Sequence, residues 1–461
     1  MGRANSIRPV SAIRIQDTLT GKPRELEPSA RGDVGIYACG PTVYGRIHIG
    51  NARPYVVFTL LKRFLEHEGL DAKLVINLTD INDKIYDAAR EAGEPSDAYA
   101  AEMTAAYVAD TDALGLERPD AEPLASGTIE EIILLIQSLI DTDHAYQANG
   151  DVYFRVRSFD DYGKLSNRDP EDMDQGEEAG TAALKEDPLD FALWKGHKEG
   201  EDTAWDSPWG RGRPGWHIEC SAMSEKELGP DFAIHGGGID LVFPHHENEI
   251  AQTEAARGVP LAEIWMHNGL VQIDEEKMSK SVGNIFQLSE AIERYGGQTV
   301  VAYLISGHYR QPLAFSDEQL QQAAARIERI RNYLRDAPSG KPDEFLAEKR
   351  QAFLDALADD FNTPQAFAVL FEIVNEGNKR ELPGARQVLG ELLPLLGLDS
   401  LIDEDEEQPP DEALALLEER EKARAAKDYD RADELRDELA RMGWEVRDEA
   451  GDSGYRLVPK Q

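Results

Sequence analysis

Short apolar runs and one amphipathic segment organise the first part of the chain. Val34–Ala38 and Leu74–Asn77 have the length and composition of buried strands. Between them, apolar residues fall on one helical face at positions 56, 57, 60, 61 and 64, and Gly69 stands where a helix cap is expected. This strand–helix–strand order predicts a βαβ unit, from which parallel, doubly wound sheets are built.

The following part of the chain interrupts this pattern. A helical stretch begins at Ile129, and an alternating strand follows at Val152–Val156. The segment from Asp169 to Asp187 is polar and acidic, and we expect it to be a loop. Because the sheet pattern resumes near Phe232–Ile234 and Ile264–His267, the intervening residues are predicted to be an insertion.

The remainder of the chain is predicted to be helical until a final hairpin. Beyond Glu318, apolar residues recur at helical spacing, which indicates a helix bundle. An acidic stretch containing Pro409-Pro410 is expected to be a linker. After it, two helices are predicted near 412–427 and 431–442, with a hairpin from Trp444 to Val458.

These patterns predict an α/β protein with a doubly wound parallel (Rossmann-like) domain carrying an insertion, followed by a helical bundle and a small C-terminal α+β domain. The expected boundaries are 12–128 and 206–262 for the Rossmann-like domain, 129–205 for the insertion, 263–320 for a region with a lysine-rich loop, 321–401 for the bundle and 412–461 for the last domain.

Charge and hydropathy narrow the class of protein. The formal charge is −39, from 49 basic and 88 acidic residues, so any contact with nucleic acid must use local basic patches. No apolar run approaches the roughly 18 residues of a membrane span. The start, Met1 to Pro9, has no apolar core of a signal peptide, so we expect a cytoplasmic protein without membrane contact.

Two motifs, distant from each other in the sequence, have the chemistry of a phosphate-binding site built from two segments. His48-Ile49-Gly50-Asn51 precedes the first predicted helix, whose N-terminus offers free N–H groups to an anion. Alone, this tetrapeptide is more often a capped turn with a surface histidine than a phosphate site. Lys277-Met278-Ser279-Lys280-Ser281 is more specific, because clustered lysines in so acidic a chain suit a triphosphate such as ATP.

Cys39 and Cys220 are the only cysteines. A disulfide is not expected in the cytoplasm, so two alternatives stand at this point: buried free thiols, or metal ligands.

The order of these motifs resembles the two signatures of class I aminoacyl-tRNA synthetases, and further segments resemble cysteinyl-tRNA synthetases in particular. Asn51 departs from the class pattern, in which histidine is frequent, but its amide retains a hydrogen-bond donor. The segments that carry the closer resemblance are Tyr37–Tyr44, Gly215–Ser221, His235–Leu241, Phe243–Glu249 and Asp359–Pro364.

The resemblance implies a zinc site. Its expected ligands are Cys39, Cys220, His245 and Glu249. His245 and Glu249 are four residues apart and share one face if they lie in a helix. His246 is the rival ligand, and Glu247 is a weaker one.

The resemblance also implies the reaction and the remaining site residues. Cysteine would attack the α-phosphate of ATP, which is accompanied by Mg²⁺, and the cysteinyl group would pass to the 3′ end of tRNA(Cys). Catalytic roles fall to His48, Asn51, Lys277 and Lys280. The residues expected to bind ATP are Thr42, His48, Gly50, Asn51, Gly238, Asp240 and Lys280, and those expected to bind cysteine are Cys39, Thr79, Trp216 and His235.

For two of these residues a structural role competes. Thr79 is also placed to cap a helix starting near Asp80-Ile81, and Trp216 is also typical of a core aromatic. The region 263–320 is expected to contact the tRNA stem, and the C-terminal domain is expected to read the anticodon, with Trp444 and Arg447 near the bases. In the bundle, Arg326, Arg329, Arg331 and Arg335 either follow a phosphate backbone or form a solvated face. We expect a monomer.

Two other functions compete with tRNA charging. One is a ligase that activates cysteine in the same way and joins it to an amino sugar, as in mycothiol synthesis; the final domain from Glu412 to Pro459 favours tRNA instead. The other is a non-catalytic, zinc-stabilised RNA-binding protein, against which the intact phosphate motifs argue.

Overall fold

The computed structural model describes residues 12–28, 32–169, 171, 173, 184–273, 276–277, 286–403, 410–448 and 455–459. The chain forms two compact units, Met1–Asp399 and Ser400–Gln461. No helix within the described ranges is long and apolar enough to cross a bilayer.

A four-stranded parallel sheet lies at the centre of the first unit. Its strands are β3 (Asp33–Ala38), β4 (Asp71–Ile76), β9 (Phe232–Gly238) and β10 (Ala262–Asn268), in the order β10-β9-β3-β4. Their inner residues are almost all buried, as expected for a sheet covered on both faces. The predicted βαβ unit is therefore confirmed. The strand order reverses at β3, and clefts for ligands form beyond the carboxyl ends of strands at such a point.

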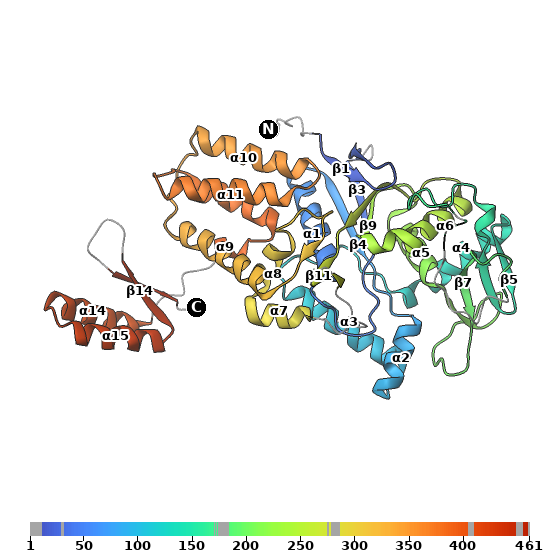
Figure 1. Cartoon of the computed structure of the whole chain (residues 1–461), viewed down its shortest axis with the longest axis horizontal. Coiled ribbons are helices and arrows are strands. Elements are labelled where there is room, and N and C mark those ends of the chain that lie inside the picture. The colour runs from blue at the N-terminus through green and yellow to red at the C-terminus, as the bar shows by residue number, and fades with distance from the viewer. Residues whose placement is uncertain are drawn as a thin grey trace, which may run out of the picture. The chain divides into compact units, whose positions relative to one another are not determined.

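Helix α1 (Ala52–His67) connects β3 to β4 and packs on the sheet (Figure 1). Its buried apolar side chains contribute about 1.5–3 kcal/mol each. Gly236 of β9 permits the close approach, because a Cβ there would stand 2.0 Å from the Phe58 ring. Gly69, with a φ of +88°, ends the helix as the sequence predicted.

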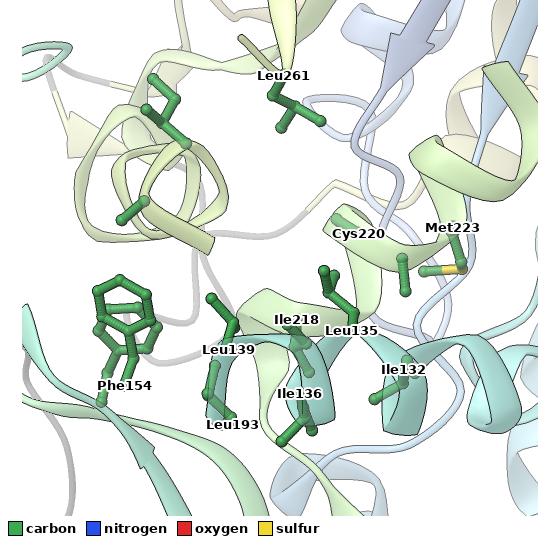
Figure 2. Close-up of a cluster of buried hydrophobic side chains, with 14 of the residues drawn as sticks. Ile132, Leu135, Ile136, Leu139, Phe154, Leu193, Ile218, Cys220, Met223 and Leu261 are labelled. Atoms are coloured by element: carbon green, nitrogen blue, oxygen red, sulfur yellow. The ribbon is translucent and has the colours of Figure 1, made fainter. Parts of the chain in front are cut away.

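The insertion adds a second sheet beside helix α4 (Ile129–Asp141). Its antiparallel strands are β5 (Ala145–Ala148), β6 (Asp151–Phe154), β7 (Phe191–Gly196) and β8 (Gly212–Pro214). Figure 2 shows the apolar core that joins this part to helix α5 (Trp216–Leu228): Ile132 and Leu135 of α4 face Ile218 and Met223 of α5. Cys220 lies in the same core, so apolar packing fixes its position.

Two observed elements cross the boundaries expected from the sequence. Strand β10 starts at residue 262 and belongs to the parallel sheet, so that sheet continues to Asn268. Strand β8 belongs to the insertion sheet although it lies beyond residue 205. In both places, pairing with a strand distant in sequence determines the sheet to which the strand belongs. A local apolar pattern does not show which strands pair.

Further elements surround these two sheets. The helix bundle is confirmed, and α9, α10 and α11 lie beside one another in Figure 1. The remaining described α-helices and β-strands of the first unit are β1 (Arg14–Asp17), β2 (Lys22–Glu25), α2 (Asp83–Ala92), α3 (Ser96–Asp112), α6 (Glu247–Arg257), β11 (Val271–Ile273), β12 (Glu276–Lys277), α7 (Leu288–Tyr295), α8 (Gly297–Leu304), β13 (Leu313–Ala314), α9 (Asp317–Asp336), α10 (Glu344–Ala358), α11 (Thr363–Gly377) and α12 (Ala385–Leu392).

The second unit contains the predicted helix pair and hairpin. Its elements are α13 (Ser400–Asp403), α14 (Asp411–Ala425), α15 (Tyr429–Arg441), β14 (Trp444–Asp448) and β15 (Tyr455–Pro459). Ala413, Leu417, Leu439, Trp444 and Leu457 form a separate small core. Trp444 is buried there, which makes it a core residue in addition to any role toward RNA.

The alternative role of Thr79 as a helix cap is wrong. Helix α2 begins at Asp83, and Asn82 caps it by accepting from the Lys84 N–H at 3.1 Å. Thr79 instead forms a β-bridge to Thr42, which prolongs the sheet before the helix can start.

One ion-pair group joins α1 to the bundle and predicts a pH-dependent stability. His67 lies 3.0 Å from both Glu68 and Glu391 of α12, and hydrogen bonds to these carboxylates raise its pKa to about 9. Since the unfolded pKa is lower, this stabilisation is complete below about pH 6.5 and is lost as the pH rises through about 9. We expect His67→Gln to lower the free energy of unfolding by about 1 kcal/mol near pH 6 and by much less near pH 10. Urea denaturation of both proteins at the two pH values measures this, and an equal difference at both would contradict it.

Candidate active site and metal centre

Most of the expected site residues surround one cavity of about 270 Å³ at the carboxyl ends of the parallel strands. Cys39 directly follows β3, and Gly238 ends β9. Helix α5 contributes residues from its first two turns, and the turn before α1 contributes the first phosphate motif. The predicted residues that line the cavity are Cys39, Thr42, His48, Gly50, Asn51, Thr79, Trp216, Cys220, Gly238, Asp240 and His245.

The first phosphate motif has a defined local geometry. The Gly50 N–H donates to His48 Nδ1 at 3.1 Å, so a neutral His48 ring carries its proton on Nε2. A side chain at position 50 would force the His48 ring to shift, because a Cβ would stand 2.9 Å from that Nδ1. Asn51 accepts from the His48 N–H through its Oδ1 at 3.2 Å, which leaves the amide nitrogen as the donor end of this side chain.

Four buried side chains bring ligand atoms together at one end of the cavity. Cys39 Sγ lies 3.7 Å from Cys220 Sγ, 3.5 Å from His245 Nε2 and 3.7 Å from Glu249 Oε1. His245 Nε2 and Glu249 Oε1 are 3.1 Å apart. The two cysteines, 181 positions apart in the sequence, therefore meet in a cluster with the donor atoms that a transition metal prefers.

Burial favours the uncharged forms of the two thiols and of His245. It raises the pKa of the Cys39 thiol well above its usual value and also raises that of Cys220. It lowers the pKa of His245 to about 3. Neutral imidazole is the form that binds a metal, whereas both thiols must lose a proton to do so.

His235 has a different position from the one expected. It is absent from the described lining of the cavity and lies behind Glu249, with its Nε2 2.9 Å from Glu249 Oε2. Its ring stacks on Trp265 at 4.4 Å. Because one Glu249 oxygen is bound to His235, the other is directed toward Cys39. His235 thus supports Glu249 and does not line the cavity.

Sequence reasoning missed two supporting histidines, His217 and His267. His217 Nδ1 lies 3.0 Å from His245 Nδ1, and His267 Nε2 lies 2.8 Å from His246 Nδ1. Together with His235, these five account for half of the ten histidines in the chain. That concentration around the two cysteine motifs was the available signal.

The two rival ligands differ in what they contact. Glu247 accepts the backbone N–H groups of Gly163 at 3.0 Å and Ser166 at 2.7 Å, so its carboxylate faces the insertion and not the cluster. His246 does reach the cluster: its Nε2 is 3.3 Å from Cys39 Sγ and 3.9 Å from Glu249 Oε1. Among the described residues, the buried group with ligand atoms close enough together to hold one metal ion is Cys39, His245, His246 and Glu249, and Cys220 Sγ lies beside it, 3.7 Å from Cys39 Sγ.

Trp216 and Thr79 form the walls near this cluster. The Trp216 ring is stacked on His245 at 4.3 Å and an interplanar angle of 23°, and it is 36% exposed, so it is not a core aromatic. Thr79 accepts from Asn77 Nδ2 at 3.4 Å, while Asn77 Oδ1 accepts from the Gly40 N–H at 3.0 Å. Asn77 therefore ties the strand end after β4 to the loop after β3.

Comparison with known proteins decides the family. The model of the tRNA synthetases class I (C) catalytic domain matches residues 25–325, a DALR domain matches 352–398, and a cysteinyl-tRNA ligase anticodon binding domain matches 407–456. A cysteine–tRNA ligase from Caldicellulosiruptor saccharolyticus is 45% identical over 455 residues, covering 95% of this chain and 98% of its own. One from Idiomarina loihiensis is 46% identical over 457 residues, covering 96% and 99%. The chain belongs to the cysteinyl-tRNA synthetase family.

Solved structures agree with this fold at much lower sequence identity. The Mycobacterium tuberculosis methionyl-tRNA synthetase in complex with methionyl-adenylate has a TM-score of 0.60 and 16% identity, covering 80% of this chain and 90% of that one. An Agrobacterium radiobacter LeuRS ternary complex has a TM-score of 0.61 and 12% identity, covering 82% and 85%. The class I synthetase architecture is thus shown for this cysteinyl-tRNA synthetase family member.

Part of the lysine motif expected in a cysteinyl-tRNA synthetase lies outside the described residues. This applies to Lys280 and to the side chain of Lys277, whose backbone forms β12. In the bundle, Arg329 bonds to Asn375 and Arg331 pairs with Glu328 at 2.9 Å. These contacts fit the alternative in which this helix presents a salt-bridged, solvated face.

Proposed function

We propose that the chain activates L-cysteine with ATP to cysteinyl-adenylate and transfers the cysteinyl group to the 3′ end of tRNA(Cys). The observation that carries this proposal is the buried cluster of Cys39, His245, His246 and Glu249, with Cys220 Sγ 3.7 Å from Cys39 Sγ, at one end of the cavity that contains the His48–Asn51 motif. A thiol-selective metal beside a phosphate site fits a cysteine-activating enzyme, and membership of the family supports the same substrate.

The donor atoms of this cluster fit zinc. In a tetrahedral zinc site with typical bond lengths, two sulfurs lie about 3.8 Å apart, sulfur and nitrogen about 3.6 Å, and sulfur and carboxylate oxygen about 3.6 Å. The corresponding distances from Cys39 are 3.7, 3.5 and 3.7 Å. His245 fits better than His246, since its nitrogen is nearer the expected separation from both Cys39 and Glu249. We therefore assign Cys39, Cys220, His245 and Glu249 as ligands, with His246 as support.

When bound, zinc would accept the substrate thiolate as an additional ligand and so select it over the hydroxyl of serine. A hydrophobic pocket alone gains only about 1–3 kcal/mol from a methylene-sized difference. The walls complete this selection, because Trp216 closes the space beside His245, and Thr79 offers a hydroxyl where the amino group of cysteine would lie.

The phosphate end performs the activation step by positioning and charge stabilisation. The cysteine carboxylate is already a nucleophile, so it attacks the α-phosphate without a general base, and pyrophosphate leaves. His48 Nε2 and the Asn51 amide nitrogen would donate to phosphate oxygens. Lys277 and Lys280 would neutralise the departing pyrophosphate, which also carries Mg²⁺.

The adenosine is expected between Thr42 and Gly238. Gly238 lets the Asp240 carboxylate fold back toward the backbone, since a Cβ there would stand 2.4 Å from Asp240 Oδ1. A carboxylate in this place suits the ribose hydroxyls. Gly50 allows the triphosphate to approach the backbone closely.

The second unit distinguishes tRNA charging from ligation to an amino sugar. Its helix pair and hairpin match an anticodon-binding domain, which an amino-sugar substrate does not require. We propose that this unit binds the anticodon, that region 263–320 contacts the tRNA stem, and that the enzyme acts as a cytoplasmic monomer.

Two assays on one preparation test the function. Cysteine-dependent ATP–pyrophosphate exchange tests activation, and charging of tRNA with a GCA anticodon tests transfer. We expect both, and we expect Lys280→Ala to reduce exchange by about 10³-fold, comparable to the loss of a strong charge contact in a transition state. Exchange without charging would favour the amino-sugar ligase. No more exchange in the unmutated protein than in Lys280→Ala would favour a binding protein.

A further inference from the structure

Arg53, in the first turn of α1, is a buried cation that the proposed mechanism does not use. It is 1% exposed, and its guanidinium donates to the backbone carbonyls of Gly269 at 2.6 Å, Gln311 at 2.7 Å and His308 at 3.0 Å. Burying a charge costs several kcal/mol unless strong partners compensate. Because three backbone carbonyls accept hydrogen bonds from one planar guanidinium, Arg53 fixes the positions of residues 269, 308 and 311 relative to one another.

The first of these segments forms one side of the ATP cavity. Gly269 follows β10 and lines the cavity with its neighbours Asn268, Leu270 and Val271. It also packs tightly on the next segment, because a Cβ at Gly269 would stand 2.3 Å from the Gln311 carbonyl. From Val271 the chain continues into β11 and β12, the strand that contains Lys277.

The His48–Asn51 motif is fixed to a second segment beyond the lysine motif. The Ile49 N–H donates to the Phe286 carbonyl at 3.0 Å, and the Leu288 N–H donates to the Ile47 carbonyl at 3.1 Å. Thus the described residues on one side of the lysine motif are bonded to the first turn of α1 through Arg53, and those on the other side are bonded to the turn before α1 through backbone bonds.

The turn that contains His308 and Gln311 is held from its other side by the helix bundle. Asp360, between α10 and α11, accepts from Tyr309 Oη at 2.6 Å and from Arg310 Nε at 2.7 Å. It also accepts from the Gln16 N–H at 2.9 Å, and it adopts a φ of +61°, which is unusual outside glycine. A residue keeps such an unfavourable backbone conformation only where the surrounding contacts stabilise it.

We propose that Arg53 and Asp360 are positioning residues for ATP, which hold the 308–311 turn between the helix bundle and the Gly269 wall of the cavity. This inference rests on the proposed function, because it concerns the ATP end of the same site. The two side chains contact opposite sides of one turn and do not need to touch substrate. The cysteine end of the cavity is built by Cys39, Thr79 and Trp216, none of which bonds to this turn.

Substitutions at Arg53 or Asp360 are expected to raise the KM for ATP and to leave the KM for cysteine nearly unchanged. Arg53→Lys keeps a cation but loses the fork that reaches three carbonyls, and Asp360→Asn keeps the shape but loses charge. We expect each to raise the KM for ATP about 10-fold in cysteine-dependent exchange, with the KM for cysteine changed less than about 2-fold. The double variant is expected to equal the worse single variant, because both act through one turn.

Matched substitutions provide the controls. Arg63→Lys changes another arginine of α1, which bonds to Asp399 and the Pro394 carbonyl at 2.6 Å. Asp359→Asn changes the neighbouring carboxylate, which is exposed and paired with Arg14. Both are expected to leave the KM for ATP unchanged, even where they lower the melting temperature.

Three results would overturn the inference: an unchanged KM for ATP in Asp360→Asn, equal changes in both Michaelis constants, or effects that multiply in the double variant. If Arg53→Lys does not fold, Asp360→Asn alone decides through the first two criteria. If the unmutated protein shows no cysteine-dependent exchange, the proposed function itself fails, and that failure is seen before any variant is made.

Discussion

Replacing Cys220 with serine is expected to release zinc and to lower kcat/KM for cysteine in ATP–pyrophosphate exchange by at least about 10³-fold. Four ligands together supply about 10–16 kcal/mol in structural zinc sites, so losing one thiolate removes about 3–4 kcal/mol. Cys220 is 1% exposed within the core between α4 and α5, so the replacement changes the ligand and leaves the packing nearly intact. Zinc content of the purified protein and exchange kinetics measure the two effects.

Helix α6 offers a matched pair of controls for this zinc prediction. Glu249→Gln removes a proposed ligand, whereas Glu247→Gln makes the same change two residues away, at a carboxylate bound to the backbone of the insertion. We expect zinc loss only in Glu249→Gln. Wild-type zinc and cysteine exchange in Cys220→Ser, or equal zinc loss in the two glutamine variants, would contradict the assignment. A zinc-depleted protein that still prefers cysteine strongly over serine would contradict the role of the metal in selection.

The sequence predicted the helices and strands around this site better than it predicted how those elements bring the site residues together. The β3–α1–β4 unit, the bundle and the final hairpin follow from local periodicity, and the structure confirms them. The meeting of Cys39 with Cys220 does not follow from spacing, because it depends on β9 pairing with β3 and on the core beneath α5. Only the resemblance to a family placed both thiols in one site.

The errors have a common physical origin. His235 was expected to face cysteine, yet strand alternation and the stack on Trp265 direct it to the far side of Glu249. Thr79 was a plausible cap, yet a bridge to Thr42 continues the sheet there. Each of these side chains could form hydrogen bonds in the expected position and in the observed one. Contacts with residues distant in sequence determine which position it takes.

Removing residues 400–461 is expected to reduce tRNA charging strongly while leaving cysteine activation intact. The second unit has its own apolar core, and the cavity, the metal cluster and the Arg53 contacts all lie in the first unit. Exchange is therefore expected to stay within about 2-fold of the full-length value. Stacking contacts to single-stranded bases contribute about 1–3 kcal/mol each, so losing two or more should lower kcat/KM for charging by about 10²-fold or more.

The anticodon provides the specific readout for this truncation. The full-length enzyme should charge tRNA with a GCA anticodon far better than the same tRNA with an altered anticodon, because direct contacts with unpaired bases read sequence. The shortened enzyme should charge both equally poorly, since the bases that differ no longer meet protein. Retained preference for GCA after truncation would place anticodon reading in the first unit, and loss of exchange together with charging would mean that the second unit is needed for the catalytic fold.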